Sequence, residues 1–152
     1  MDTRLLTLGG LLAGRLLFGG MFLWSGISNL AEIDGRIGYA ASKGLPAAAF
    51  LVPAASLLLV AGGISLLTGF RPILGVAAIA AFLVGVTPLM HNFWALKGFE
   101  QIIEMHSFEG NVGLLGGAIA LLAIPRPWPV SADGLVQYIA QSTRTPATAE
   151  AI

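Results

Sequence analysis

Both histidines and three of the five glutamates of this 152-residue chain lie between residues 87 and 117, and the sequence around them is mostly apolar. A histidine next to a carboxylate can donate and accept protons at a quinone carbonyl, and aromatic side chains can line the rest of such a site. One hypothesis is therefore a binding site for a quinone or lipid headgroup. Its candidate residues are His91, Asn92, Trp94, Glu109 and Asn111.

The same polar residues also have a structural interpretation. Polar side chains are costly at membrane depth, so they usually face the inside of a helix bundle and pair with one another. Here they would tie three helix ends together, with Asn29 contributed by the first apolar segment, and satisfy the backbone groups that Pro88 leaves free. His91 and Asn92 would then bond to Asn29, Glu109 or Asn111.

Metal and haem sites are not expected in this chain, and no catalytic residue is assigned. A lone histidine–glutamate pair is a poor metal site. A bis-histidine haem needs axial ligands on facing helices, whereas His106 falls in an expected loop. The chain has no cysteine, which excludes disulfides, thiol redox chemistry, iron–sulfur clusters and thiolate zinc. A quinone is the one cofactor candidate.

Composition places these residues in a membrane protein. Hydrophobic residues make up 56% of the chain and charged residues only 11%, against about 25% charged in a soluble domain. The mean hydropathy is +0.83. The net charge is zero, so the chain has no electrostatic footprint for nucleic acid. The expected partners are membrane lipids and other membrane proteins.

Four apolar segments are long enough, or nearly so, to cross a bilayer, which takes about 20 helical residues. The intervening residues 31–45 and 97–107 are more polar and are expected to be loops. The sequence therefore predicts an all-α protein, an antiparallel bundle of four transmembrane helices within residues 1–126, followed by a cytoplasmic tail, residues 127–152. The predicted spans are residues 5–30, 46–69, 72–96 and 108–124.

The turn between the second and third spans is so short that these helices must be antiparallel neighbours. An even number of spans puts both termini on one side of the membrane. Four basic residues lie on that side and three on the other, which weakly favours cytoplasmic termini. In the tail, Trp128 is expected at the membrane interface, Asp133 is expected to cap a short helix, and the last ten residues are expected to be disordered.

Arg15 is a second anomaly, because it follows about ten apolar residues, or roughly 15 Å of helix. It could extend towards the membrane surface, or face the bundle and bind helix-end carbonyls or an anionic lipid. A structural role is favoured. Gly113 and Gly117 lie four residues apart in the last span. They would let another helix approach closely, either in this bundle or in a partner.

Several motifs in this order resemble the DoxX family over roughly residues 11–126. They are the segment RLLFGGMFLWSGISN that starts at Arg15, the Lys43-Gly-Leu-Pro turn, His91-Asn-Phe-Trp, and FEGNVGLLGG from Phe108. The resemblance implies a four-helix inner-membrane protein of bacteria or archaea. Some relatives are membrane subunits of thiosulfate:quinone oxidoreductase. The positions that the resemblance carries over are Arg15, His91, Asn92, Glu109 and Asn111.

Two departures weaken any transfer of enzymatic activity from that family. Leu59 stands in the neighbourhood where many members have a glutamate, and Glu109 stands where a basic or neutral residue is common. The first functional hypothesis is therefore an accessory subunit that packs on a larger respiratory or photosynthetic membrane complex. The alternative is the membrane subunit of a quinone-linked oxidoreductase, with the quinone headgroup near His91. A transporter has less support.

Overall fold

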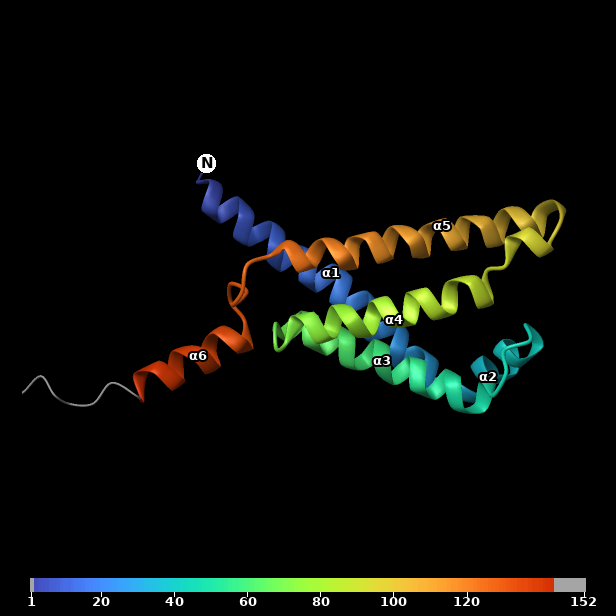
Figure 1. The fold of residues 1–152 in the computed structure, drawn as a ribbon, viewed down its shortest axis with the longest axis horizontal. Coiled ribbons are helices and arrows are strands. Elements are labelled where there is room, and N and C mark those ends of the chain that lie inside the picture. Colours follow the sequence, from blue (N-terminus) through green and yellow to red (C-terminus); the bar gives the residue numbers. More distant parts are fainter. Residues whose placement is uncertain (1, 144–152) are drawn as a thin grey trace, which may run out of the picture.

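The computed structural model describes residues 2–143, and every regular element in that part of the chain is helical (Figure 1). The prediction of an all-α fold is therefore confirmed. In order, the elements are α1 (Thr3–Ala31), α2 (Ile33–Ser42), α3 (Ala48–Thr68), α4 (Pro72–Met90), the 3-10 turn η1 (Phe93–Ala95), α5 (Gly98–Ala120), the 3-10 turn η2 (Leu121–Ala123) and α6 (Ala132–Ser142).

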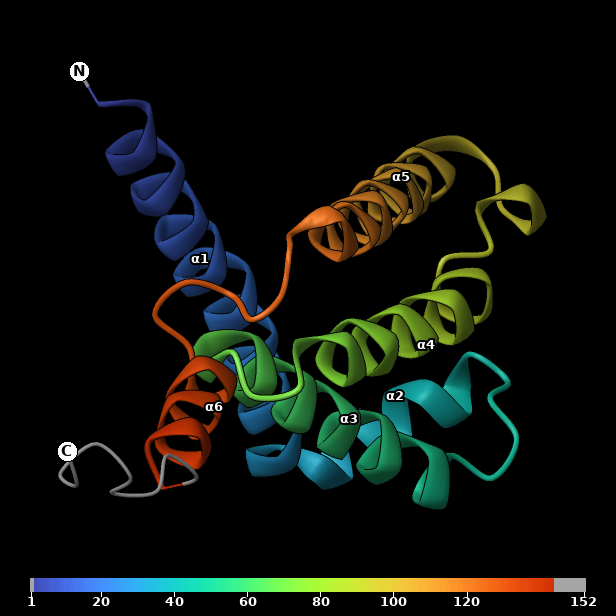
Figure 2. The same ribbon diagram turned by 60° about the vertical axis from the view of Figure 1, so that its left-hand side comes forward.

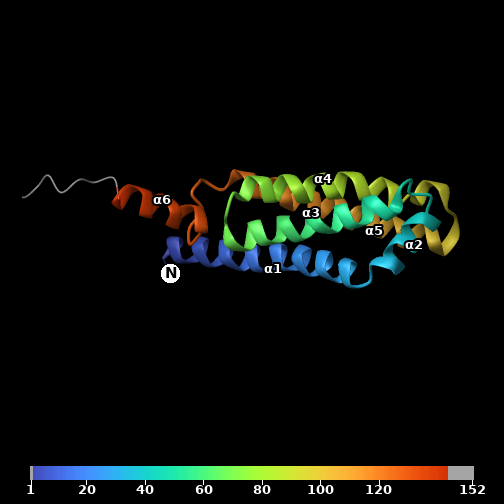
Figure 3. The ribbon, with the colours of Figure 1, turned by 90° about the horizontal axis from the view of Figure 1, so that it is seen from below.

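The four longest helices, α1, α3, α4 and α5, run up and down alongside one another (Figures 1 and 3). Among the described residues, α1, α3 and the segment Pro72–Ala95 are long and apolar enough to cross a membrane. The chain is thus a polytopic α-helical membrane protein. The N-terminal half of α5 carries three glutamates, so a fourth span remains a prediction.

The turn between α3 and α4 is built from residues that leave the right-handed helical region. Gly69 has φ 65° and Arg71 has φ 46°, and Pro72 then begins α4. Proline suits this first helical position because its missing N–H would have no partner there. The start of α1 and helix α6 lie at the same end of the bundle as this turn (Figures 1 and 3).

Adjacent glycines in α3 allow it to pack closely on both of its neighbours. A Cβ atom added to Gly63 would lie 2.6 Å from the backbone N of Leu23 in α1, and one added to Gly62 would lie 2.8 Å from Ile79 in α4. Each glycine therefore serves a different helix–helix contact. This is the close-packing use of small residues expected between membrane helices.

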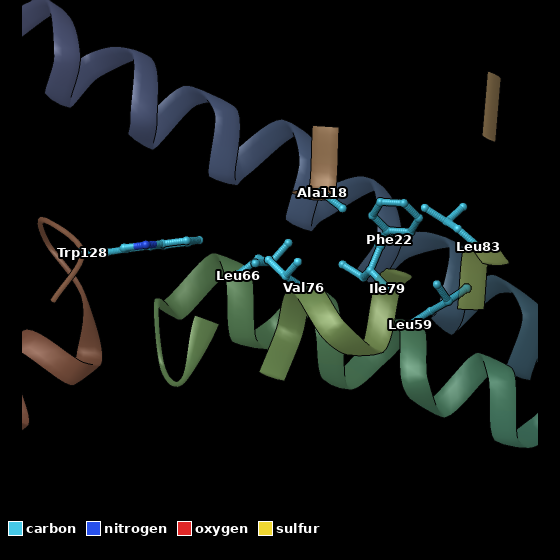
Figure 4. Packing of buried hydrophobic residues seen from close by; sticks show 8 residues of the cluster. All are labelled: Phe22, Leu59, Leu66, Val76, Ile79, Leu83, Ala118 and Trp128. Atoms are coloured by element: carbon cyan, nitrogen blue, oxygen red, sulfur yellow. The ribbon is translucent and has the colours of Figure 1, made fainter. Parts of the chain in front are cut away.

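One buried apolar cluster joins α1, α3, α4 and α5 (Figure 4). Trp128 belongs to it and is only 3% exposed. The position at the membrane interface that the sequence predicted for it stays a prediction. The segment that leads into α6 lies against the end of the bundle, and the indole ring of Trp128 is covered there. The members of the cluster are Phe22, Leu59, Leu66, Val76, Ile79, Leu83, Ala118 and Trp128.

Both segments that the sequence predicts to be loops are largely helical. Residues 31–45 contain α2, whose Ile37 and Ala40 pack with Ala48 and Met90 in a second small apolar cluster. Residues 97–107 form the start of α5 instead of a connection. The prediction was wrong because it relied on polarity, whereas apolar residues at helical spacing find a surface at the ends of α3 and α4.

The tail helix α6 is capped by a different residue from the one that the sequence predicted. Ser131 is its N-cap, and its hydroxyl accepts a hydrogen bond from the N–H of Gly134 at 3.1 Å. Asp133 lies in the first turn and instead accepts a hydrogen bond from the N–H of Arg71 at 3.0 Å. That bond holds α6 against the α3–α4 turn. The disorder predicted for the last ten residues concerns positions outside the part of the chain described, apart from Thr143.

Candidate functional site

The histidine at the end of α4 is positioned by a change of chain direction. His91 is the C-cap of α4, and its N–H donates to the carbonyl of Thr87 at 3.0 Å. The chain then turns through η1 and begins α5 at Gly98, which has φ 66°. This reversal brings Glu104 back to His91, so that Nδ1 and Oε2 lie 2.7 Å apart.

The other oxygen of the same carboxylate binds a lysine from a third element. Lys43, the C-cap of α2, donates from Nζ to Oε1 of Glu104 at 2.7 Å. The side chains are 14% exposed for Glu104, 24% for His91 and 27% for Lys43. One half-buried carboxylate therefore connects the ends of α2 and α4 to the start of α5. We refer to Lys43, His91 and Glu104 as the carboxylate-centred triad.

Two of these residues titrate away from their ordinary ranges, and both lie outside the apolar spans. The hydrogen bond from Lys43, followed by that of His91, lowers the pKa of Glu104. The hydrogen bond to Glu104 raises the pKa of Lys43. The triad is therefore held as an ionised carboxylate and an ammonium at neutral pH. The carboxylate of Glu104 thus keeps its negative charge next to the ring of His91.

Three aromatic rings lie in mutual contact next to His91. Phe93 and Trp94 have ring centroids 5.3 Å apart, and Phe108 lies 5.4 Å from Phe93 and 6.0 Å from Trp94. All three contacts are edge-to-face, the arrangement favoured by aromatic quadrupoles. Trp94 is 58% exposed and Phe99, at 76%, lies outside the group. The aromatic group next to His91 thus consists of these three rings.

The structure separates the predicted site residues. His91 bonds to Glu104 and not to Glu109, which instead lies 3.4 Å from His106 in an exposed pair. Glu104 and Glu109 are five residues apart, and five residues turn an α-helix by about 140°. The two carboxylates therefore point to different sides of α5. Asn29, Asn92 and Asn111 are half-buried, and their side chains make no hydrogen bond within residues 2–143.

Sequence reasoning missed Lys43 and Glu104 as members of the site, because both were assigned to loops. A helical spacing of residues 99, 102, 103 and 106 is the signal that could have found Glu104. The helix that this spacing indicates continues into the glycine-rich segment as α5. A helix starting near residue 98 places Glu104 close to the end of α4. Lys43 carries no comparable signal, since only the packing of α2 brings it there.

Arg15 forms a second polar centre at the opposite end of the bundle. Its side chain is buried, at 3% exposure, and donates to the carbonyls of Leu66 (3.0 Å) and Leu67 (2.7 Å) at the end of α3. Its Nη1 also donates to the carbonyls of Pro129 and Val130, each at 3.0 Å. Of the alternatives left open, the structure shows that Arg15 faces the bundle and binds helix-end carbonyls.

Arg15 lies close to one end of the bundle. It lies level with the last turn of α3, and the start of α1 continues past that end (Figure 2). Its guanidinium carbon is 5.6 Å from the centre of the Trp128 ring, a cation–π distance. The residue thus ties α1, α3 and the tail together. Within residues 2–143, no buried side-chain nitrogen or oxygen lacks a partner.

The triad can perform limited chemistry. With Nδ1 engaged by the carboxylate, Nε2 is the nitrogen of His91 that remains for a ligand, where it could donate or accept a proton. No group of three or more His, Asp or Glu side chains in the described part of the chain could hold a metal ion. The triad is therefore suited to a polar headgroup or to a structural tie.

Comparisons with known proteins agree with a membrane fold of this kind. The DoxX family model matches residues 10–92, which include Arg15, Lys43 and His91 but not Glu104. The inner membrane protein YphA of Escherichia coli (strain K12) is 29% identical over 125 residues, which are 81% of this chain and 87% of that protein. No solved structure matches the chain.

Proposed function

The chain belongs to the DoxX family, and from that premise we propose that it is a small accessory subunit of a larger membrane protein complex. It would sit in the inner membrane, as its relative does, and pack against a partner through helix α5. The complex would be a respiratory or photosynthetic one.

The observation that carries this proposal is the exposed glycine face of α5. No atom lies within 4 Å of a Cβ built on Gly110 or Gly113, whereas one built on Gly117 would lie 3.3 Å from Phe18 of α1. Positions 110, 113 and 117 share one side of a helix. The face that contacts α1 at Gly117 thus continues as a small-residue surface onto which a partner helix fits.

The rest of α5 supports the same proposal. Ala118 is the one buried residue of this helix, and α5 packs mainly against α4. Exposed Ile103, Val112 and Ile119 would face lipid or a partner. A peripheral helix with an open glycine face is suited to association inside the membrane, where close van der Waals packing drives helix contact.

We expect Gly113→Leu to detach the chain from its partner without disturbing its own bundle. The added side chain would keep a partner helix at a distance but would meet nothing in this chain. The measurement is native mass spectrometry of gently solubilised source membranes, in which the fraction of chain found inside a larger complex should fall at least tenfold.

The matched control is Gly117→Leu, which collides with Phe18 and should loosen the contact between α1 and α5 within the chain itself. Its melting temperature should fall, while that of Gly113→Leu should stay at the wild-type value. A Gly113→Leu chain that remains in the complex in normal amount would contradict the proposed interface.

A second candidate function is supported by the carboxylate-centred triad. We infer that a quinone headgroup could meet Nε2 of His91, next to the aromatic group of Phe93, Trp94 and Phe108. This would suit the membrane subunit of a quinone-linked oxidoreductase of the thiosulfate:quinone type. The chain would need a redox partner, because it carries no cysteine and residues 2–143 hold no group of three His, Asp or Glu side chains that could bind a metal ion.

On the quinone hypothesis, His91→Ala should weaken binding of a short-chain benzoquinone at least tenfold, because the hydrogen bond to the quinone carbonyl is lost. Quenching of tryptophan fluorescence measures the binding, since Trp94 is adjacent and exposed. His106→Ala removes an exposed histidine of α5 that is not part of the triad, and it should leave binding unchanged. Equal quenching curves for His91→Ala and the wild type would exclude His91 as the headgroup ligand.

A further inference from the structure

We propose that the end of the bundle near Arg71 and Arg126 binds the phosphate headgroup of an anionic phospholipid. The site lies between the α3–α4 turn and the segment that leads into α6, at the opposite end from the carboxylate-centred triad. It is independent of the accessory function and of the quinone hypothesis.

The first observation is a cavity of suitable size and position. It has a volume of about 310 Å³ and is lined by residues of three elements. Because the α3–α4 turn connects two apolar spans, the cavity lies where these spans leave the bilayer. A lipid headgroup is therefore at the right depth to enter it. The lining residues are Arg71, Pro72, Ile73, Leu74, Arg126 and Asp133.

The second observation is the charge of the lining. Neither Arg71 nor Arg126 forms an ion pair within residues 2–143. The one carboxylate in the lining, that of Asp133, accepts the backbone N–H of Arg71 at 3.0 Å. Two guanidiniums against one carboxylate leave a net positive charge, which suits a phosphodiester with a single negative charge. Arginine is well matched to phosphate because it can donate two parallel hydrogen bonds.

The third observation distinguishes a lipid from a soluble phosphate. Ile73 and Leu74 lie in the first turn of α4 and are 39% and 59% exposed. They continue the lining of the cavity onto the membrane-facing side of an apolar span, where acyl chains would run. The N-terminal end of α4 lies at the same place and favours an anion electrostatically.

The backbone at Arg71 adds to this argument. Its φ of 46° is in the left-handed region, which glycine adopts most easily. Within residues 2–143 its guanidinium contacts the ring of Phe70, at 5.6 Å, and forms no ion pair that would support the turn. An arginine at a position that suits glycine is explained if its side chain binds something outside the chain.

The test is native mass spectrometry of the purified full chain titrated with phosphatidylglycerol. We expect one lipid per chain to be retained, with an apparent affinity at least tenfold higher than for phosphatidylcholine. Arg71→Gln and Arg126→Gln should each reduce the affinity for phosphatidylglycerol about tenfold, which equals about 1.4 kcal/mol. Both residues are exposed, and circular dichroism should show unchanged helix content.

Arg4→Gln is the matched control. Arg4 is exposed on the start of α1, at the same end of the bundle, and does not line the cavity. It should bind phosphatidylglycerol like the wild type. An equal loss with Arg4→Gln would indicate general attraction of anionic lipid and overturn the site. Displacement of the lipid by millimolar inorganic phosphate would also overturn it, because the ligand would then be soluble phosphate.

Discussion

Gly63→Ala should destabilise the bundle, although a single methyl group is added and alanine is the better helix former. The new Cβ atom would lie 2.6 Å from the backbone N of Leu23 and 2.8 Å from the carbonyl oxygen of Gly19. Both of these are backbone atoms of α1 and cannot rotate away. The α1–α3 contact must therefore widen, and the packing of Phe22 and Leu59 in the core would be lost with it.

Overpacking of this kind costs about 1–3 kcal/mol, and more where the backbone itself must move. For a chain of this size we expect the melting temperature in detergent to fall by roughly 5–10 °C. Thermal unfolding followed by size-exclusion chromatography of the heated sample measures it.

Gly85→Ala, in the neighbouring helix α4, should not destabilise the bundle. Nothing lies within 4 Å of a Cβ built on Gly85, and alanine is favoured over glycine in a helix by about 1 kcal/mol. Its melting temperature should stay the same or rise. Equal melting temperatures for Gly63→Ala and Gly85→Ala would show that the close approach of α1 and α3 does not limit stability.

Arg15→Met should release the tail from the bundle. Methionine fills a similar volume but leaves the carbonyls of Leu66, Leu67, Pro129 and Val130 without the donors that Arg15 supplies. Removing the partner of a buried polar group costs about 1–3 kcal/mol per group. We expect a total loss of at least about 3 kcal/mol, because more than one carbonyl is affected.

The release can be followed at Trp128, whose ring lies 5.6 Å from the guanidinium carbon of Arg15. In a background with Trp24→Phe and Trp94→Phe, its fluorescence should shift towards that of a water-exposed indole. Protease cleavage between residues 126 and 143 should become at least tenfold faster. Arg15→Lys keeps the charge but places its donors on one nitrogen. Its fluorescence shift and its cleavage rate should lie between those of Arg15→Met and the wild type.

Arg36→Met is the control for loss of charge. Arg36 pairs with Glu32 at 2.9 Å, and the side chains are 46% and 69% exposed. Exposed pairs of this kind contribute about 0–1 kcal/mol. The tail should stay protected in this variant. If Arg15→Met leaves Trp128 fluorescence and proteolysis unchanged, the four hydrogen bonds do not hold the tail.

The carboxylate-centred triad and Arg15 satisfy charged groups near a membrane with different kinds of partner. Glu104 is paired with two potential cations, so its charge is balanced by neighbouring side chains. Arg15 is surrounded by carbonyls and an aromatic ring and has no carboxylate partner in the described residues. Both centres connect elements that are far apart in the sequence. Each therefore contributes to the shape of one end of the bundle.

The sequence by itself determined the class of protein and the approximate helices. Three helical segments that are long and apolar enough to cross a membrane overlap closely with the predicted residues 5–30, 46–69 and 72–96. The reason is that a bilayer requires long apolar helices, and hydropathy reports this requirement directly. The use of Gly62 and Gly63 for close packing was also predictable. The short turn before Pro72 fixed the antiparallel order of α3 and α4 in the same way.

Only the tertiary structure decided which polar residues meet. His91 was predicted to bond to Asn29, Glu109 or Asn111. The early start of α5 brings Glu104 to it instead, and the packing of α2 adds Lys43. Trp128 was expected at the membrane interface from its position alone, and only the structure shows that its ring is buried against Arg15. Hydropathy depends on local composition, whereas these contacts depend on the rotation and relative depth of whole helices. A shift of a few residues along a helix changes the partner, because each residue turns it by about 100°.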